Sequence, residues 1–151
     1  MELFSEKLQS FLDDFGKGRK MVLSTSENDR VSSRMMSVVM INGFFCFQTD
    51  RELRKYGQLM ANSNAALCID NIQIEGICEE LGHPLENGDF CKAFRECFRG
   101  SYDAYTFLEN ERLFALRPIY IERWLYIEST PCIEIFDIQA QRYSCERYKS
   151  I

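Results

Sequence analysis

Short β-rich runs separated by tight-turn signals dominate the first half of this sequence of 151 residues. Three runs rich in branched, aromatic and hydroxyl side chains follow one another closely, at 21–26, 31–41 and 44–49. Asn28-Asp29 and Asn42-Gly43 separate them, and Asn-Gly is a strong signal for a two-residue hairpin turn because both residues tolerate positive φ. Runs this short and this closely spaced predict antiparallel strands joined by hairpins rather than a parallel sheet.

The rest of the chain contains further strand and helix patterns. Alternating apolar and polar residues predict four more strands, at 65–70, 72–81, 114–127 and 131–138. Helical spacing of apolar residues predicts helices at about 2–16, at 86–98 and at 102–110. Thr49-Asp50-Arg51-Glu52 has the form of a capping box, which predicts another helix directly after Thr49.

Six or so mostly antiparallel strands with a few helices outside favour a closed or nearly closed barrel, because closure removes exposed strand edges. The predicted fold class is mainly β (α+β): a six-stranded antiparallel barrel with flanking helices. A content of 46% hydrophobic and 13% aromatic residues is enough for a real core. We therefore expect a single domain over 1–151.

Charge and cysteine content limit the partners and the compartment. A formal net charge of -5 gives no general attraction to nucleic acid or to anionic membranes, so neither is expected as a partner. The seven cysteines are odd in number and form no CxxC pair, which predicts reduced thiols in a cytoplasm. The N-terminus lacks the apolar run of a signal peptide, and no stretch is long enough to span a membrane. We expect a cytoplasmic protein.

The common catalytic and metal-binding motifs do not occur. The sequence contains no GxSxG, GxxxxGK, HExxH or GxGxxG, so no catalytic residue is assigned. His83 has Cys78, Cys91 and Cys97 in its neighbourhood, but their spacing matches no zinc site, and no metal is expected.

Arg54 and Lys55 form a basic pair at the predicted start of the second helix. Arginine offers a planar fork of donors, lysine adds a compact charge, and the amides at a helix N-terminus favour anions. With Arg34 on a neighbouring strand, these cations would hold a phosphate despite the nearby Asp50 and Glu52. The alternative is that the pair belongs to an ordinary solvated helix surface.

The order of these residues resembles the pyridoxamine 5'-phosphate oxidase-like FMN-binding split barrels. In that family a strand similar to Ser33–Val38 runs beside the flavin ring. A strand carrying a threonine, here Thr49, follows it, and a basic pair, here Arg54-Lys55, binds the phosphate. The similarity covers roughly residues 20–124 and implies a split barrel that holds FMN at the interface of a homodimer.

The resemblance also implies a set of cofactor-binding residues. They are Arg34, Met35, Met36, Ser37, Val38, Gln48, Thr49, Arg54, Lys55, Asn71 and Trp124. Backbone groups of 35–38 and the Asn71 amide would orient the ring, which needs no catalytic acid or base from the protein. Met35 and Met36 point to opposite faces of their strand, one toward the core. Trp124 would reach a flavin, including that of the partner chain, or pack as a core or interface residue.

Two departures separate the chain from the true oxidases. Val39 stands where those enzymes carry a lysine, and no Arg-x-His-x-Arg pattern follows Trp124. The resemblance therefore implies an FMN-dependent oxidoreductase or reductase with a nicotinamide electron donor and a small-molecule acceptor, not a pyridoxamine phosphate oxidase. The alternatives are a non-enzymatic flavin- or haem-binding module, with His83 as axial ligand, and a dimeric scaffold with an empty pocket.

Overall fold

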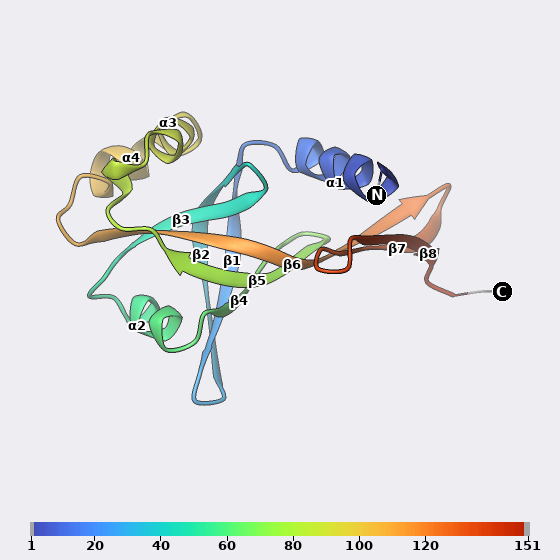
Figure 1. Cartoon of the computed structure of the whole chain (residues 1–151), viewed down its shortest axis with the longest axis horizontal. Coiled ribbons are helices and arrows are strands. Elements are labelled where there is room, and N and C mark those ends of the chain that lie inside the picture. Colours follow the sequence, from blue (N-terminus) through green and yellow to red (C-terminus); the bar gives the residue numbers. More distant parts are fainter. Residues whose placement is uncertain (1, 150–151) are drawn as a thin grey trace.

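The computed structural model describes residues 2–149 of the chain, and most of them lie in strands (Figure 1). The strands are β1 (Gly18–Glu27), β2 (Arg30–Ile41), β3 (Phe44–Asp50), β4 (Asn64–Ile69), β5 (Ile72–Glu80), β6 (Glu111–Ile127), β7 (Thr130–Asp137) and β8 (Arg142–Arg147). The helices are α1 (Glu2–Phe15), α2 (Arg54–Ala61), α3 (Gly88–Cys97) and α4 (Arg99–Tyr105), with a 3₁₀ turn, η1, at Pro84–Glu86. Positions 1, 150 and 151 lie outside the described residues.

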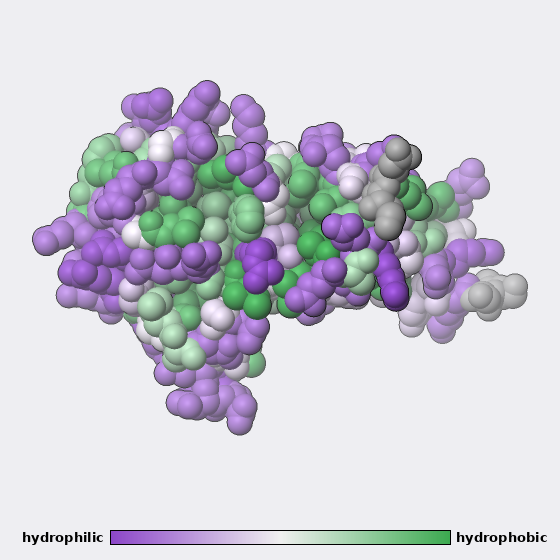
Figure 2. Space-filling model, viewed as in Figure 1, coloured by the Kyte–Doolittle hydropathy of each residue, from purple (hydrophilic) through white to green (hydrophobic). Residues whose placement is uncertain are grey.

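The first two hairpins turn where the sequence predicts. Asn28 and Asp29 have φ of 52° and 62°, and Asn42 and Gly43 have φ of 52° and 83°. Positive φ at both central residues matches the right-handed twist of the flanking strands. The long β1–β2 hairpin projects from the body at the bottom of Figure 1, and its tip is hydrophilic in Figure 2.

Six antiparallel strands close into a barrel in the order β3-β2-β1-β4-β5-β6, with β3 pairing β6. The predicted six-stranded antiparallel barrel with flanking helices is confirmed. β6 is 17 residues long, so its second half leaves the barrel and pairs with β7, and β8 adds to β7 (Figure 1). The pattern at 131–138 predicted β7, whereas the polar sequence of β8 gave no strand signal.

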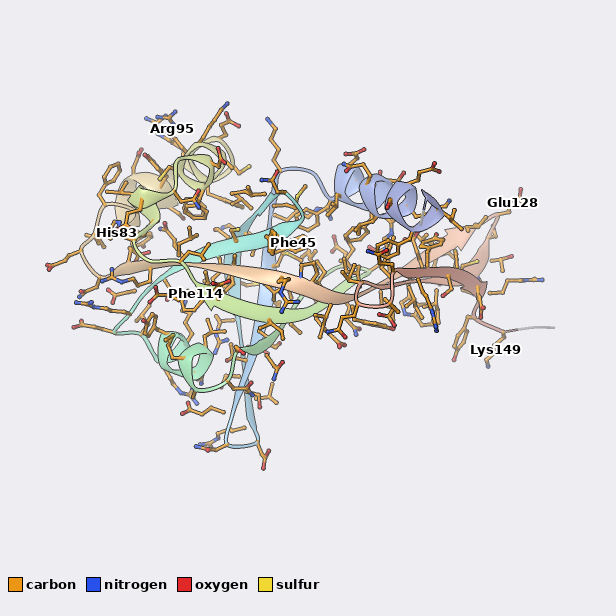
Figure 3. The ribbon with its side chains drawn as sticks, in the orientation of Figure 1. Phe45, His83, Arg95, Phe114, Glu128 and Lys149 are labelled. Atoms are coloured by element: carbon orange, nitrogen blue, oxygen red, sulfur yellow. The ribbon has the colours of Figure 1, made fainter. Side chains whose placement is uncertain are left out.

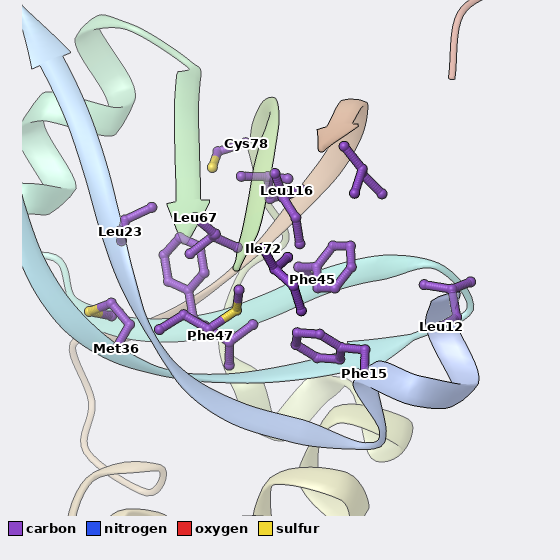
Figure 4. Packing of buried hydrophobic residues seen from close by; sticks show 14 of the residues in the cluster. Leu12, Phe15, Leu23, Met36, Phe45, Phe47, Leu67, Ile72, Cys78 and Leu116 are labelled. Carbon is purple, nitrogen blue, oxygen red and sulfur yellow. The ribbon is translucent and has the colours of Figure 1, made fainter. Parts of the chain in front are cut away.

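Aromatic side chains fill the barrel. Phe45 and Phe47 alternate with outward residues on β3 and are fully buried, and Phe47 stacks on Phe114 with ring centroids 5.7 Å apart. Phe15 of α1 meets Phe45 edge to face (Figure 4). A second, smaller core on the outer face joins the strands to α3, through Val39, Cys46, Leu113, Phe90 and Phe94. This outer core fixes α3 beside β2, β3 and β6.

Two local predictions were wrong. Thr49 does not cap a helix: it continues β3, opposite Arg112, and its hydroxyl donates to the Asp50 carbonyl. α2 starts only at Arg54, after the extended Leu53, which supplies no side-chain cap. The predicted helix at 102–110 is also misplaced, because α4 ends at Tyr105 and a short turn then leads into β6.

Two general properties concern membranes and thiols. Within residues 2–149, every helix is too short or too polar to cross a bilayer. The seven cysteines are all free thiols.

Candidate functional site

β2 and β3 separate after a short stretch of pairing. Val39 to Ile41 pair with Cys46 to Phe44, but from Phe45 onward β3 pairs with β6. In the described residues, the edge of Met35–Val38 that faces β3 therefore has no strand partner. Backbone N–H and C=O groups need hydrogen-bond partners, so this open edge can serve a bound molecule.

A cavity of about 350 Å³ lies beside the open edge. Six of the predicted site residues line it: Met35, Met36, Ser37, Gln48, Thr49 and Lys55. Tyr105 of α4, Asp50 of β3 and Glu111 of β6 also contribute to its wall. The volume falls in the range of small-molecule sites.

Met35 and Met36 point to opposite faces of β2, as the strand geometry predicts. Met36 is 8% exposed and belongs to the barrel core, whereas Met35 is 54% exposed on the outer face. Val38 is fully buried in the core, so only its backbone can reach the open edge. Gln48 is buried, and its amide oxygen accepts a 2.9 Å hydrogen bond from Thr106, which ties the end of α4 to β3.

Lys55 reaches the cavity from the first turn of α2. Its ammonium is half-buried and donates a 3.4 Å hydrogen bond to the sulfur of Met36. Among the residues that the structure describes, no carboxylate lies within ion-pair distance of it. Burial lowers the pKa of Lys55, and the positive charge of Arg34 lowers it further, while Glu111 acts in the opposite direction. Lys55 is thus a cation without a close counter-ion.

Arg34 is fixed by a network of buried polar groups. Its guanidinium donates to the Leu23 carbonyl at 3.2 Å, to the Thr25 hydroxyl at 2.9 Å and to the Gln58 amide oxygen at 2.7 Å. The Thr25 hydroxyl in turn donates to the same Gln58 oxygen. Burial lowers the pKa of Arg34, and so does the charge of Arg54. The network holds Arg34 near two further cations.

Arg54 and Lys55 line different cavities. Arg54 lines a space of about 540 Å³ with Gln58 and the tip of the β1–β2 hairpin, including Arg30 and Asp29. Arg54 is exposed, and consecutive residues at a helix start point in different directions. Its charge still acts on Arg34, so the three cations form one cluster around the start of α2.

Asp50 and Glu111 occupy directly opposite positions on β3 and β6. Like charges in this cross-strand arrangement repel each other. Glu111 is only 5% exposed. Its burial and the charge of Asp50 raise the pKa of Glu111 to about 7, although Lys55 lowers it. The cavity wall therefore carries a carboxyl group that titrates near neutral pH.

Asn71 and Trp124 lie together, but away from the cation cluster. The Asn71 amide donates a 2.6 Å hydrogen bond to the Trp124 carbonyl, and both residues line a separate cavity of about 320 Å³. Up to roughly 40 Å of extended strand separates Trp124 from Glu111 along β6. Trp124 is 38% exposed and packs against Tyr148. One chain does not bring these two residues to the cavity beside β2.

His83, which is labelled in Figure 3, lies directly before η1. Both of its ring nitrogens make hydrogen bonds to backbone groups of the protein. Nδ1 accepts a hydrogen bond from the Leu85 amide at 3.1 Å, and Nε2 lies 2.8 Å from the Leu108 carbonyl oxygen. Because a carbonyl only accepts, Nε2 carries the proton and Nδ1 supplies its lone pair to Leu85. Binding of iron by His83 would require one of these bonds to break.

Sequence reasoning missed several residues at the site. Gln58 is 3% exposed and accepts a hydrogen bond from Arg34. Its only signal in the sequence is its position four residues after Arg54 on the same helix. Glu111 and Tyr105 reach the cavity through long-range packing of β6 and α4, for which the local sequence gives no sign.

The chain matches no family model and no curated protein. Solved structures do match. PhzG from Burkholderia lata 383, in complex with tetrahydrophenazine-1-carboxylic acid, is 14% identical with a TM-score of 0.65 over 98% of this chain and 91% of that one. A pyridoxamine 5'-phosphate oxidase-related, FMN binding protein from Nostoc punctiforme is 15% identical, with a TM-score of 0.62 over 99% and 94%.

A haem protein shares the architecture as well. HutZ, the haem storage protein from Vibrio cholerae, is 14% identical with a TM-score of 0.58 over 76% of this chain and 89% of that one. At such identities the likeness defines the fold, while different proteins with that fold carry different functions. The chain therefore has the fold of the pyridoxamine 5'-phosphate oxidase-like FMN-binding split barrels, and the resemblance seen in its sequence is confirmed at the level of the fold.

Proposed function

We propose that this chain binds FMN in the cavity beside the open edge of β2. The observation that carries the proposal is the position of one cavity between the unpaired backbone of Met35–Val38 and the half-buried Lys55 ammonium. A flavin ring has a polar edge that needs backbone donors and acceptors, and FMN ends in a phosphate that needs cations. The unpaired backbone and the ammonium fit these two requirements.

The phosphate would lie near the start of α2, where Lys55, Arg34 and Arg54 gather. Mutual repulsion among these cations is relieved by a bound anion, which adds to the gain from charge-assisted hydrogen bonds. Leu53 supplies no side-chain cap, and the Tyr56 amide bonds to the Leu53 carbonyl, so the amides of Arg54 and Lys55 at the start of α2 are left to serve the same anion. Thr49 adds a hydroxyl to the cavity.

We further propose that the bound flavin serves an oxidoreductase or reductase activity. When bound, FMN supplies two-electron chemistry: a reduced nicotinamide donor is oxidised by loss of a hydride, and a small acceptor is reduced. The residues of the chain orient the ring along β2 and cover it with Met35 and with Tyr105 of α4. Val39 is fully buried, so its position offers nothing to a pyridoxamine phosphate substrate, and we do not assign that activity.

The proposed working form is a cytoplasmic homodimer. Trp124 lies too far along β6 to complete the cavity of its own chain, and Asn71, in the turn between β4 and β5, is hydrogen-bonded to it. Their position supports a role opposite the flavin of a second copy. Seven free cysteines are in keeping with a reducing compartment. Light scattering at working concentration tests the assembly, and a monomer in the presence of FMN would contradict it.

Haem binding through His83 is the less favoured alternative. A haem protein shares the fold, but the hydrogen bonds from Leu85 and to Leu108 occupy both ring nitrogens of His83. A non-enzymatic flavin carrier remains compatible with the same cavity. Bound FMN without oxidation of NADH or NADPH, tested with soluble electron acceptors, would favour this carrier role over an enzyme.

A thermal-shift titration tests the central proposal. A ligand that prefers the folded state raises Tm as its concentration exceeds Kd. We expect FMN to raise the Tm of the wild type. In the double variant Arg54→Ala, Lys55→Ala most of this increase in Tm should be lost. A protein that gains no stability from FMN and leaves its visible spectrum unchanged would refute the proposal.

A further inference from the structure

We propose that Glu111 couples the binding of the FMN phosphate to the uptake of one proton near neutral pH. This inference rests on the proposed FMN site and adds a specificity-determining residue to it. The site would favour a phosphorylated flavin when Glu111 is neutral and disfavour it when Glu111 is charged.

The geometry places a carboxyl group in the cavity proposed to hold FMN. Glu111 lines the same cavity as Lys55 and Thr49, and it is almost fully removed from solvent. Asp50 faces it across the β3–β6 ladder and lines the cavity too. A dianionic phosphate drawn to Lys55 therefore meets two carboxyl groups that line the same cavity.

The groups around Glu111 come from every element that packs against the cavity. Asp50 on β3 and Lys55 on α2 act on it as charges, and Tyr105 on α4 lines the same cavity as a phenol. From β2 and α3 the neighbours are Met35, Met36, Ser37 and Phe94, which carry no charge.

Arginines do not neutralise Glu111. Arg112, next to it on β6, donates to the backbone oxygens of Glu109 and Glu111, and Arg34 is engaged with Leu23, Thr25 and Gln58. Lys55 is thus the one cation that lines the cavity with Glu111, among the residues that the structure describes.

The pKa of Glu111 should change when an anion binds beside Lys55. Burial and Asp50 raise its pKa to about 7, and Lys55 is the group that restrains this rise. A phosphate that pairs with Lys55 cancels the restraint and adds negative charge, so the pKa of Glu111 rises further in the complex. Linkage is reciprocal: a proton favoured by the phosphate must itself favour the phosphate.

The experiment measures the Kd of FMN by flavin fluorescence between about pH 6.5 and 8.5, above the second phosphate pKa of about 6. If FMN binding takes up one proton, the affinity falls by up to tenfold for each unit that the pH rises. We therefore expect the affinity of the wild type to fall by about tenfold from the lower to the upper end of the range. Glu111→Gln keeps the shape of the side chain without the titration, and its affinity should stay nearly constant. Riboflavin, which has no phosphate, should show no such dependence in either protein.

Calorimetry in two buffers with different ionisation enthalpies gives a second readout. The wild type should take up at most about three-quarters of a proton per FMN at pH 7.5, because a pKa of about 7 leaves roughly a quarter of Glu111 protonated before binding, and Glu111→Gln should take up close to none. The exposed Glu146 of β8 provides a matched control, since Glu146→Gln should behave as the wild type. Asp50→Asn removes one cause of the raised pKa of Glu111 and should move the loss of affinity to lower pH.

The outcomes separate this inference from the function on which it rests. FMN binding that does not vary with pH, or that varies equally in wild type and Glu111→Gln, would overturn the role of Glu111 and leave the FMN site standing. A wild type that binds no FMN at any pH would overturn both.

Discussion

The Lys55 ammonium of α2 donates its hydrogen bond to the thioether sulfur of Met36 on β2, 3.4 Å away. A thioether is a weak acceptor, and an ammonium group has three donors to place. The contact therefore holds Lys55 across the gap between helix and strand without satisfying it. An anion that enters the cavity replaces a poor partner with a strong one.

Replacing Lys55 tests this relationship. Lys55→Met keeps the apolar stem and should weaken FMN binding by about 10- to 100-fold, the value of one charge-assisted hydrogen bond. Riboflavin affinity should change little, because the loss concerns the phosphate. Fluorescence titration of both flavins measures the difference, with the exposed Lys92→Met as control. Equal losses of affinity for FMN and riboflavin would mean that Lys55 contacts the flavin ring instead of the phosphate.

The Gln58 network should be important for stability. Gln58 accepts from Thr25 and Arg34 and donates to Ser32. Gln58→Met preserves the volume but leaves these partners unsatisfied, at a cost of roughly 1–3 kcal/mol in the free energy of unfolding. Urea denaturation measures it, with the exposed Gln73→Met as control. A cost below a few tenths of a kcal/mol would mean that the network is not closed in solution.

The raised pKa of Glu111 predicts a pH-dependent stability. Because the folded-state pKa of about 7 lies above the unfolded value, Glu111 favours the folded state when protonated, and this contribution is lost as pH rises through 7. Glu111→Gln should therefore gain stability relative to the wild type between pH 5 and pH 8, by at most roughly 3 kcal/mol. Urea denaturation at both pH values measures the gain. A constant difference would contradict the raised pKa.

Gly76 should tolerate no side chain. It sits at a β-bulge where β5 meets β6, and an added Cβ would overlap the Arg117 carbonyl and the Leu116 side chain. Gly76→Ala should lower the free energy of unfolding by roughly 3 kcal/mol or more. Gly88→Ala, with open space around the added carbon, should leave it unchanged or slightly higher. Similar unfolding midpoints for the two variants would contradict the close approach.

Local sequence signals predicted the parts of the fold that short-range physics controls. Asn42-Gly43 specified its hairpin because positive φ is a property of those two residues. Thr49 shows the limit: its capping-box pattern is genuine, but pairing with Arg112 on β6 extends β3 through that position and overrides the cap. Strand β8 has few apolar residues and is held by its partner β7, which the local pattern does not reveal.

The residues of the candidate site likewise include some that a local sequence motif predicts and others that only the tertiary structure brings together. Lys55 and Thr49 lie six residues apart in sequence and reach the same cavity, so a motif could identify them. Glu111 reaches that cavity only because β3 leaves β2 and pairs with β6. Asn71 and Trp124 were predicted to contact a flavin, but Trp124 lies far along β6 from Glu111, and Asn71, in the β4–β5 turn, is bonded to Trp124. Their role depends on a second chain, which remains a prediction.

A crystal structure of the FMN complex tests the central claim most directly. It should place the phosphate within hydrogen-bond distance of Lys55 Nζ and close to Arg34, with the polar edge of the ring against the backbone of Met35–Val38. A phosphate bound elsewhere, or a ring that does not contact the open edge of β2, would contradict the proposed site.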